Sequence, residues 1–364
     1  MKLDRIDIIH TAIPLNQTFR TSFGAITEQH SIIAKIYSDG AVAYGEACPF
    51  YAPVYSYECI STMKAVIAEF VAPSVLGREL SGPAEYLKMV DSIKGHNHAK
   101  ATIETALWDL ESKTREIPLW KLVGGTNPRV DIGVSIGIQP TADDLLSKIQ
   151  SYLDEGYRRI KVKIEPGKDL ETVETVRSRF PDITLMVDAN SSYTLDDVEL
   201  LSGLDQYNLL MIEQPLSEDD IVDHSQLQSR IKTPICLDES IHSVEDARKA
   251  VHLGSCRIVN VKYGRVGGIL NSIRIHNVCR SAGIGCWAGG MIETGIGQRF
   301  KLAISTLENF VYAADIETSD RFLVEDIVTP SIAHANGFLD ANTDYQVDEA
   351  KLNRYTSDIV ICRP

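Results

Sequence analysis

Charged residues that end short β-branched runs recur at an almost constant interval in the middle of this chain. They follow one another at spacings of 25, 25, 25 and 24 residues and are Lys163, Asp188, Glu213, Asp238 and Lys262. One strand and one helix with their connections fill such an interval, so the spacing predicts consecutive βα units. Because parallel strands end at the same edge of a sheet, we expect these five side chains to meet at one rim.

The segments after Pro128 favour a barrel. Eight of them have strand character and alternate with helical stretches; they lie near residues 131–136, 160–164, 184–188, 209–213, 234–238, 257–262, 283–288 and 310–315. Eight units are typical of a TIM barrel, although this region is shorter than the roughly 250 residues of a usual one. A doubly wound open sheet is the alternative.

The first part of the chain has a different pattern. From Ile6 to Ala47 apolar and polar residues alternate, and Asp39-Gly40 separates two of the runs, which predicts an antiparallel hairpin. From Tyr57 to Leu122 apolar residues recur at helical spacing. The expected units are an α+β domain over 1–125, a barrel over 126–325 and a C-terminal segment over 326–364 that packs back on the first domain.

Charge and cysteine content exclude several classes of function. The 364 residues include 36 Lys plus Arg and 50 Asp plus Glu, a net charge of −14, so nucleic acids and anionic membranes are not expected partners. The seven cysteines are scattered without a CxxC pair, unlike a disulfide framework or a thiolate zinc site. No signal peptide and no membrane-spanning run is apparent. We therefore expect a cytoplasmic protein.

Three of the strand-end residues are carboxylates: Asp188, Glu213 and Asp238. Carboxylates that converge in a cleft of low dielectric repel each other unless a cation neutralises them. An oxygen donor set without His or Cys favours Mg²⁺, with Mn²⁺ as a substitute, over Zn²⁺. A single strand-end Asp more often caps a helix, but three carboxylates at one register predict a metal site.

The lysines of this register have the chemistry of proton carriers. Lys161 and Lys163 alternate with Val162, so both ammonium groups are expected to point into the barrel. A second ammonium and a divalent cation nearby disfavour protonation of Lys163, which predicts a lowered pKa and a role as base. Lys262 lies four strands further round and would face the substrate from the opposite side. The sequence leaves open whether both lysines act as bases or one stabilises the developing enolate.

Longer motifs give a specific resemblance that covers both parts of the chain. They are TSFG (21–24), KVKIEPG (161–167), VDAN (187–190), IEQPL (212–216), TPICLDES (233–240), GRVGG (264–268) and GGMIETG (289–295). With them the sequence resembles the muconate-lactonizing subgroup of the enolase superfamily, and within it the o-succinylbenzoate synthase and N-succinylamino acid racemase group.

The resemblance implies a (β/α)7β barrel and an α+β capping domain built from the N-terminal region and the C-terminal tail. It also implies that the three carboxylates bind Mg²⁺ and that Lys163 and Lys262 are the catalytic acid and base. Substrate contacts are implied for Lys161, Asn190, Ser135, Gly290, Met291, Ile292, Phe23 and Tyr55. Glu239 and Arg265 are expected directly behind the groups that contact the substrate.

The activity implied is abstraction of an α-proton from a small-molecule carboxylate. The reaction would be dehydration of 2-succinyl-6-hydroxy-2,4-cyclohexadiene-1-carboxylate to o-succinylbenzoate, racemization of N-succinylamino acids, or both. Related barrels are commonly homo-oligomers, and we expect the same here. The chain departs from the group's pattern at Tyr263, Gln298, Asn97 and His98, which bears on the identity of the substrate.

Two alternatives remain at this point. A dipeptide epimerase or a muconate-type cycloisomerase would use the same scaffold, but Asp315-Ile316-Glu317 stands where an epimerase would carry Asp-x-Asp. A catalytically inactive barrel that serves as a binding module is the alternative from another class. The complete set of lysines and carboxylates argues against it.

Overall fold

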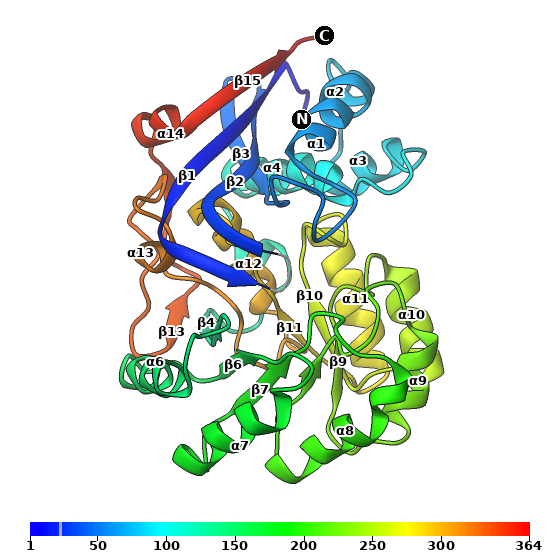
Figure 1. The fold of residues 1–364 in the computed structure, drawn as a ribbon. Helices are drawn as coiled ribbons and strands as arrows, with labels where there is room; N and C mark the ends of the chain where they lie inside the picture. Colours follow the sequence, from blue (N-terminus) through cyan, green and yellow to red (C-terminus); the bar gives the residue numbers. More distant parts are fainter. Residues whose placement is uncertain (22–23) are drawn as a thin grey trace.

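The computed structural model describes residues 1–21 and 24–364 and has two parts. In Figure 1 an antiparallel sheet with its helices forms a capping domain above a curled sheet of parallel strands. Both chain ends lie on the capping domain. The expected fold, a modified TIM barrel with an α+β cap, is confirmed. In the described part of the chain, no helix has the length and apolar character needed to cross a membrane.

The capping sheet joins the two ends of the chain. Its strands, in spatial order, are β15 (Thr356–Cys362), β1 (Arg5–Thr21), β2 (Gly24–Ser38) and β3 (Ala41–Ala47). The predicted hairpin is confirmed, because β2 and β3 pair across a turn in which Asp39 and Gly40 have φ angles of 49° and 80°. Positive φ at both turn residues matches the right-handed twist of the flanking strands. The tail returns through β15, which pairs with β1.

The helices of the capping domain bury an apolar face against this sheet. They are α1 (Ile60–Val66), a π-helical turn (Ile67–Val71), α2 (Ala72–Val75), α3 (Pro83–Met89), α4 (Asn97–Arg115) and α5 (Leu119–Leu122). Helix α4 passes so close to β3 that a Cβ atom on Gly45 would lie 2.2 Å from the carbonyl oxygen of Thr102. Only glycine permits this approach.

The barrel sheet contains seven parallel strands. They are β5 (Val134–Ile136), β6 (Ile160–Lys163), β7 (Leu185–Asp188), β8 (Ile212–Glu213), β9 (Ile235–Leu237), β10 (Ile258–Val261) and β11 (Gly285–Ala288). Lys163 pairs with Asp188, and Asp188 pairs with Glu213. The 25-residue interval therefore leads from a residue on one strand to the residue paired with it on the next strand.

Two of the predicted strands differ in the structure. The segment 131–136 divides into β4 (Arg129–Asp131), which pairs with β13 (Phe338–Asp340), and β5. The segment 310–315 is not a regular strand; it makes single parallel bridges from Phe310 to Cys286 and from Ala314 to Ile132. Between these bridges the carbonyl oxygen of Ala313 accepts a hydrogen bond from the Arg159 guanidinium. These bridges still link β11 to the start of the barrel.

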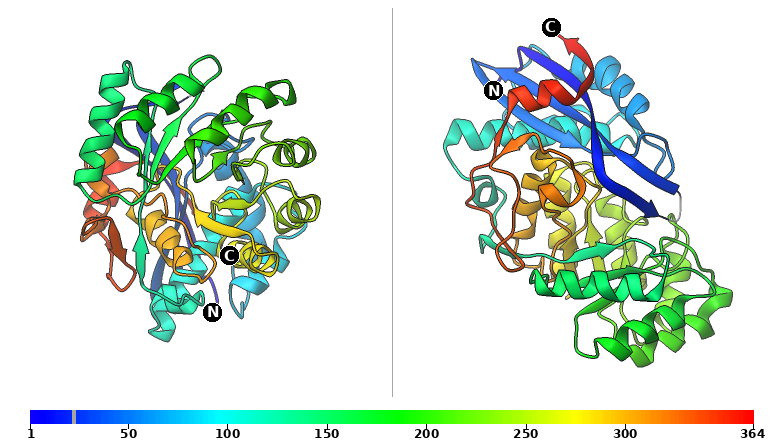
Figure 2. Two further views of the ribbon diagram at one scale, coloured as in Figure 1. Left: turned by 90° about the horizontal axis from the view of Figure 1, so that it is seen from below. Right: turned by 60° about the vertical axis from the view of Figure 1, so that its left-hand side comes forward.

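Helices surround the barrel sheet, as the left view of Figure 2 shows. They are α6 (Ala142–Asp154), α7 (Asp169–Arg179), α8 (Val198–Gly203), α9 (Val222–Gln228), α10 (Val244–Leu253), α11 (Ile269–Ser281) and α12 (Gly295–Ser305). Local sequence sets their starts: the Thr141 and Ser243 side chains accept hydrogen bonds from backbone N–H groups in the first turns of α6 and α10. Two short helices, α13 (Ser319–Phe322) and α14 (Glu349–Tyr355), lie in the C-terminal part.

Two buried carboxylates of the capping domain hold it on the barrel. Glu104 of α4 accepts hydrogen bonds from the backbone N–H groups of Ile269 and Leu270 at the start of α11. Glu46 of β3 accepts from the backbone N–H groups of Thr294 and Gly297 at the start of α12. Each carboxylate thus satisfies the free N–H groups of a barrel helix.

Glu104 should make the stability of the protein depend on pH. Burial raises its pKa to about 7 from 4.5, against hydrogen bonds that lower it. Between these values the native state holds a proton that the unfolded state has released, so the free energy of unfolding falls as pH rises. Glu104→Gln removes this titration. The free energy of unfolding should then decrease less between pH 4.5 and 8, as measured by urea unfolding. Glu111→Gln on the same helix is the control, and equal slopes for Glu104→Gln and the wild type would contradict the assignment.

Candidate active site

The predicted register brings three carboxylates into one buried layer. Asp188 and Glu213 are the last residues of β7 and β8, and Asp238 directly follows β9. Their exposed fractions are 2%, 0% and 1%. Carboxylates this deeply buried need positive partners.

Lysines and one arginine supply that positive charge. Lys161 Nζ lies 3.0 Å from Glu213 Oε2 and 3.5 Å from Asp188 Oδ2. Lys163 Nζ donates to Asp188 Oδ2 at 2.7 Å and also to Asn190 Oδ1. On the other side of the barrel, Lys262 and Arg265 both pair with Asp238, and the Lys262 Nζ to Asp238 Oδ2 distance is 2.7 Å.

The electrostatic balance differs between the carboxylates. Burial and, to a smaller extent, the charge of Asp188 raise the pKa of Glu213 to about 7, against the opposing charge of Lys161. Burial also acts on Asp238, but Arg265 and Lys262 outweigh it and hold the pKa of that carboxyl below its usual value. For Lys262 burial opposes the charge, yet Asp238 prevails and raises its pKa. The cations therefore outweigh burial at Asp238 but not at Glu213.

Glu239 adds a further carboxyl to the layer. Its Oε1 atom accepts from Asn190 Nδ2 at 3.2 Å, and its buried Oε2 atom has no hydrogen-bond partner among the described residues. Burial raises the pKa of Glu239 to about 8, and the charge of Asp238 adds to the effect. Glu213 and Glu239 are therefore both weaker acids than an exposed glutamate.

Asp315 holds the Lys161 ammonium group, and Arg159 in turn holds Asp315. Asp315 forms ion pairs with Arg159 and with Lys161, the latter at 3.1 Å, and it accepts from Ser135 Oγ at 2.9 Å. The Trp287 ring lies under both cations, with Arg159 Cζ 4.8 Å and Lys161 Nζ 5.1 Å from its centroid. These contacts fix the position of the Lys161 ammonium group.

A loop of the capping domain closes over Lys262. Tyr55 Oη accepts hydrogen bonds from Lys262 Nζ and from Arg265 Nη1, each at 3.0 Å. Burial raises the pKa of Tyr55 to about 12, with a further contribution from the charge of Asp238. The phenol is therefore neutral at physiological pH and links the loop to the lysine.

One cavity of about 80 Å³ collects most of the predicted site residues. Those that line it are Tyr55, Ser135, Lys161, Lys163, Asp188, Asn190, Lys262, Gly290, Met291 and Ile292. Glu213, Asp238, Glu239 and Arg265 are buried beside this lining and contact it through the hydrogen bonds above. The remaining predicted contact residue, Phe23, lies outside the described residues.

Several lining residues were not predicted as part of the site. They are Phe19, Phe50, Asp315, Glu317 and Phe322. Asp315 had a usable signal, because it ends the eighth strand candidate as Asp188 and Glu213 end theirs. Arg159, which directly precedes β6 and pairs with Asp315, had one too, since it alternates with Lys161 and Lys163. The three phenylalanines come from distant segments, and no spacing relates them.

The donor set fits a hard divalent cation. Among residues 1–21 and 24–364 no three carboxylate, imidazole or thiol groups converge closely enough to hold a metal ion, and Lys161 Nζ contacts both Asp188 and Glu213. The donors are oxygens only, and mutual repulsion together with burial raises the pKa of Glu213. A cation that replaced an ammonium partner would relieve that repulsion, so these residues suit Mg²⁺ or Mn²⁺.

Comparison with known proteins identifies the class. The family model for the mandelate racemase / muconate lactonizing enzyme N-terminal domain matches residues 5–124, and the enolase C-terminal domain-like model matches residues 144–345. The chain belongs to the mandelate racemase and muconate lactonizing enzyme family of the enolase superfamily, and it is an enzyme.

Its relatives are similar over nearly their whole length. The o-succinylbenzoate synthase of Geobacillus kaustophilus is 45% identical over 361 residues, 98% of this chain and 96% of that protein. The N-succinylamino acid racemase of Thermus thermophilus is 40% identical over 339 residues, 93% and 92% of the two chains. A crystal structure of an enolase superfamily member from Listeria innocua has a TM-score of 0.97 at 39% identity and covers 100% of this chain and 99% of its own.

Proposed function

We propose that this enzyme abstracts the α-proton of a small carboxylate substrate with the help of Mg²⁺. The reaction is the dehydration of 2-succinyl-6-hydroxy-2,4-cyclohexadiene-1-carboxylate to o-succinylbenzoate, the racemization of N-succinylamino acids, or both. The observation that carries the proposal is the placement of Lys163, at the end of β6, and Lys262, directly after β10, in one cavity that Asp188 lines and beside which Glu213 and Asp238 are buried. Relatives named for both reactions support it.

Asp188, Glu213 and Asp238 would hold the metal ion. When bound, Mg²⁺ supplies positive charge beside the substrate carboxylate, which lowers the free energy of the negative charge that develops there. Lys161, held by Asp315, is placed to bind the same carboxylate as a fixed cation. Asn190 lies beside it and orients Lys163.

Lys163 and Lys262 carry the protons. A neutral lysine on one side removes the α-proton, and the ammonium group on the other side stabilises the resulting negative charge. In dehydration the hydroxyl group then leaves with a proton as water and the ring becomes aromatic. In racemization the opposite lysine returns a proton to the other face of the same carbon. One pair of lysines serves both reactions.

Metal binding should stabilise the folded protein. A ligand at 100 times its Kd adds about 2.7 kcal/mol to the free energy of unfolding, so Mg²⁺ should raise the melting temperature by several degrees. Glu213→Gln weakens the site and should lose most of this shift, whereas the surface variant Glu199→Gln should keep it. A shift of equal size in Glu213→Gln would remove Glu213 from the set of ligands. Differential scanning calorimetry of chelator-treated protein, without and with added Mg²⁺, gives the melting temperatures.

A dipeptide epimerase is the second candidate, since its scaffold is the same. It needs an unpaired carboxylate to bind the substrate ammonium group. Here Asp315 is paired with Arg159 and Lys161, and Glu317 is paired with Arg321. The pairing favours the succinyl substrates over a dipeptide.

Parallel assays separate the reactions. Formation of o-succinylbenzoate with kcat/KM above ~10⁴ M⁻¹s⁻¹, within the ordinary enzyme range, would establish the synthase. Racemization of N-succinylamino acids without it would establish the racemase. If only an Ala-Glu dipeptide is turned over, the enzyme is a dipeptide epimerase and neither a synthase nor a racemase.

A further inference from the structure

Helix α4 of the capping domain lies against the segment that links β10 to α11. We call this segment, residues 262–268, the β10 connection; it opens with Lys262. A Cβ atom on Gly264 would lie 2.9 Å from His98 Cδ2, so only glycine permits this approach. Glu104 of the same helix accepts a hydrogen bond from the first backbone N–H group of α11. The position of α4 therefore bears directly on the segment that carries Lys262.

Asn97, the first residue of α4, makes two hydrogen bonds into the barrel. Its Nδ2 atom donates to the carbonyl oxygen of Arg265 at 2.8 Å and to that of His242 at 2.9 Å. Arg265 belongs to the β10 connection. His242 belongs to the preceding one, the β9 connection, which covers residues 238–243 and opens with Asp238. One amide group thus uses both of its N–H donors to join the two connections.

The loop that carries Tyr55 ends on the same turn of α4. Glu58, the last residue of this loop, is 2% exposed. It accepts hydrogen bonds from the backbone N–H groups of His98 at 2.8 Å and Ala99 at 3.0 Å, and its Oε1 atom lies 3.1 Å from His98 Nδ1. These bonds fix a buried carboxylate at the start of a helix. The first turn of α4 therefore also holds the loop that covers Lys262.

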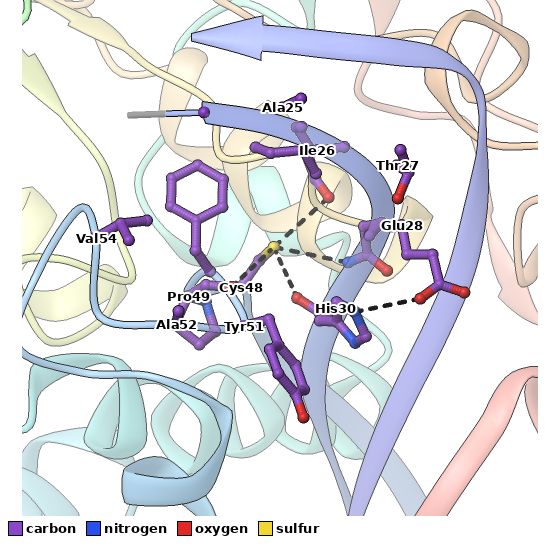
Figure 3. A pocket seen from close by; sticks show the side chains of 14 residues that line it. Ala25, Ile26, Thr27, Glu28, His30, Cys48, Pro49, Tyr51, Ala52 and Val54 are labelled. Carbon is purple, nitrogen blue, oxygen red and sulfur yellow. Dashed lines mark hydrogen bonds and ion pairs between the residues drawn. The ribbon is translucent and has the colours of Figure 1, made fainter. Parts of the chain in front are cut away.

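The other end of this loop is held at Cys48. Figure 3 shows the Cys48 side chain beside His30, whose carbonyl oxygen lies 3.3 Å from Cys48 Sγ. Between the two ends, Tyr51 and Val54 are 65% and 50% exposed, so these side chains pack little against the rest of the protein. Contacts at the ends of the loop therefore set where Tyr55 lies.

The two lysines of the active site differ in what holds them. Among the described residues, the hydrogen bonds of Lys163 Nζ go to Asp188 and Asn190, both of the barrel. Lys262 Nζ, in contrast, also bonds to Tyr55 of the capping domain. The contact between α4 and the barrel is therefore expected to act on one lysine of the pair and to leave the other in place.

We infer that Asn97 is a positioning residue for Lys262. By joining the β9 and β10 connections from the capping domain, it sets where the Lys262 ammonium group stands relative to the α-carbon of the substrate. The inference rests on the proposed function, because it takes Lys262 to be one of the two proton carriers. A misplacement of about 1 Å can lower a rate on the order of 10²-fold, so loss of Asn97 should slow proton transfer at Lys262 selectively.

Exchange of the α-proton of each enantiomer of an N-succinylamino acid tests this selectivity, by ¹H NMR in D₂O with Mg²⁺ at saturating substrate. Asn97→Ala removes both hydrogen bonds, and Asn97→Asp removes them while keeping a side chain that suits the first turn of a helix. Both should slow the enantiomer that depends on Lys262, identified with Lys262→Met, at least ~10-fold more than the other. Asn353→Ala, at an exposed position on α14, should keep both rates. Equal slowing of both enantiomers, or an unchanged ratio, would overturn the inference.

Amide hydrogen exchange, followed by mass spectrometry, tests the contact without the reaction. The N–H groups of Ile241 and Gly268 donate to carbonyl oxygens within the β9 and β10 connections at 3.0 and 2.8 Å. In Asn97→Ala both should lose protection about 3- to 10-fold, the effect of one net hydrogen bond, while Ile164 after β6 should keep it. Unchanged protection at Ile241 and Gly268 would overturn the inference. Wild-type protein that exchanges neither enantiomer would overturn the proposed function, and the amide protection then shows whether Asn97 still joins the two connections.

Discussion

Replacing Lys163 with Met should lower the rate of α-proton exchange of one substrate enantiomer by about 10²- to 10⁴-fold, the usual contribution of a positioned acid or base. Lys163 lines the cavity, and its Nζ atom is held by Asp188 and Asn190. Methionine is unbranched and nearly as long as lysine, but it is uncharged and cannot accept or donate the proton. Proton exchange in D₂O, followed by ¹H NMR with each enantiomer of an N-succinylamino acid, gives the rates.

The second lysine gives this prediction its internal control. Lys262→Met should abolish exchange of the enantiomer that Lys163→Met spares, because the two lysines lie at the ends of β6 and β10. Lys168→Met, whose side chain is 71% exposed, should exchange both enantiomers at the wild-type rate. If Lys163→Met exchanges both enantiomers normally, Lys163 is not a base. If both variants lose both enantiomers, one lysine acts only as a stabilising cation.

Asp238→Asn should lower the free energy of unfolding by about 3–5 kcal/mol, the usual effect of breaking a buried ion pair. Asp238 is 1% exposed and pairs with both Lys262 and Arg265, which are also buried. Asparagine is nearly isosteric, so the loss would come from the two cations left without a charge. The measurement is urea unfolding in EDTA, which removes any contribution of a metal.

The same variant should lose the metal-dependent reaction, because Asp238 is one of the three proposed ligands. Asp219→Asn, on an exposed loop, is the control for both readouts. An Asp238→Asn protein with wild-type stability would show that Lys262 and Arg265 find other partners. Wild-type activity in that variant would remove Asp238 from the metal site.

The barrel was predictable because its repeat is local. One βα unit fills about 25 residues, so the interval from Lys163 to Asp188 to Glu213 fixed both the strand order and the height of the rim, and the pairing of these residues confirms it. The hairpin at Asp39-Gly40 was predictable for the same reason, since two residues determine the turn. Periodicity over short distances carries this kind of information.

Other features depend on contacts between distant segments. Arg159 and Asp315 are 156 residues apart and meet only when the barrel closes, and the same guanidinium group donates a hydrogen bond to the Ala313 carbonyl oxygen in the segment 310–315. The cavity wall combines Phe50 of the capping domain with Ile292 of the barrel. No spacing in the sequence predicts such pairs. The contact of Phe50 with the barrel follows from how the capping domain sits on it, which Glu46 and Glu104 hold in place.

The most direct test of the central proposal is exchange of the α-proton of an N-succinylamino acid in D₂O, compared with Mg²⁺ and with EDTA. The proposed mechanism predicts loss of the α-proton NMR signal with Mg²⁺, no loss with EDTA, and recovery of exchange when Mg²⁺ or Mn²⁺ is restored. Exchange at the same rate in EDTA would contradict the role of the metal. Absence of exchange and of dehydration under every condition would contradict α-proton abstraction itself.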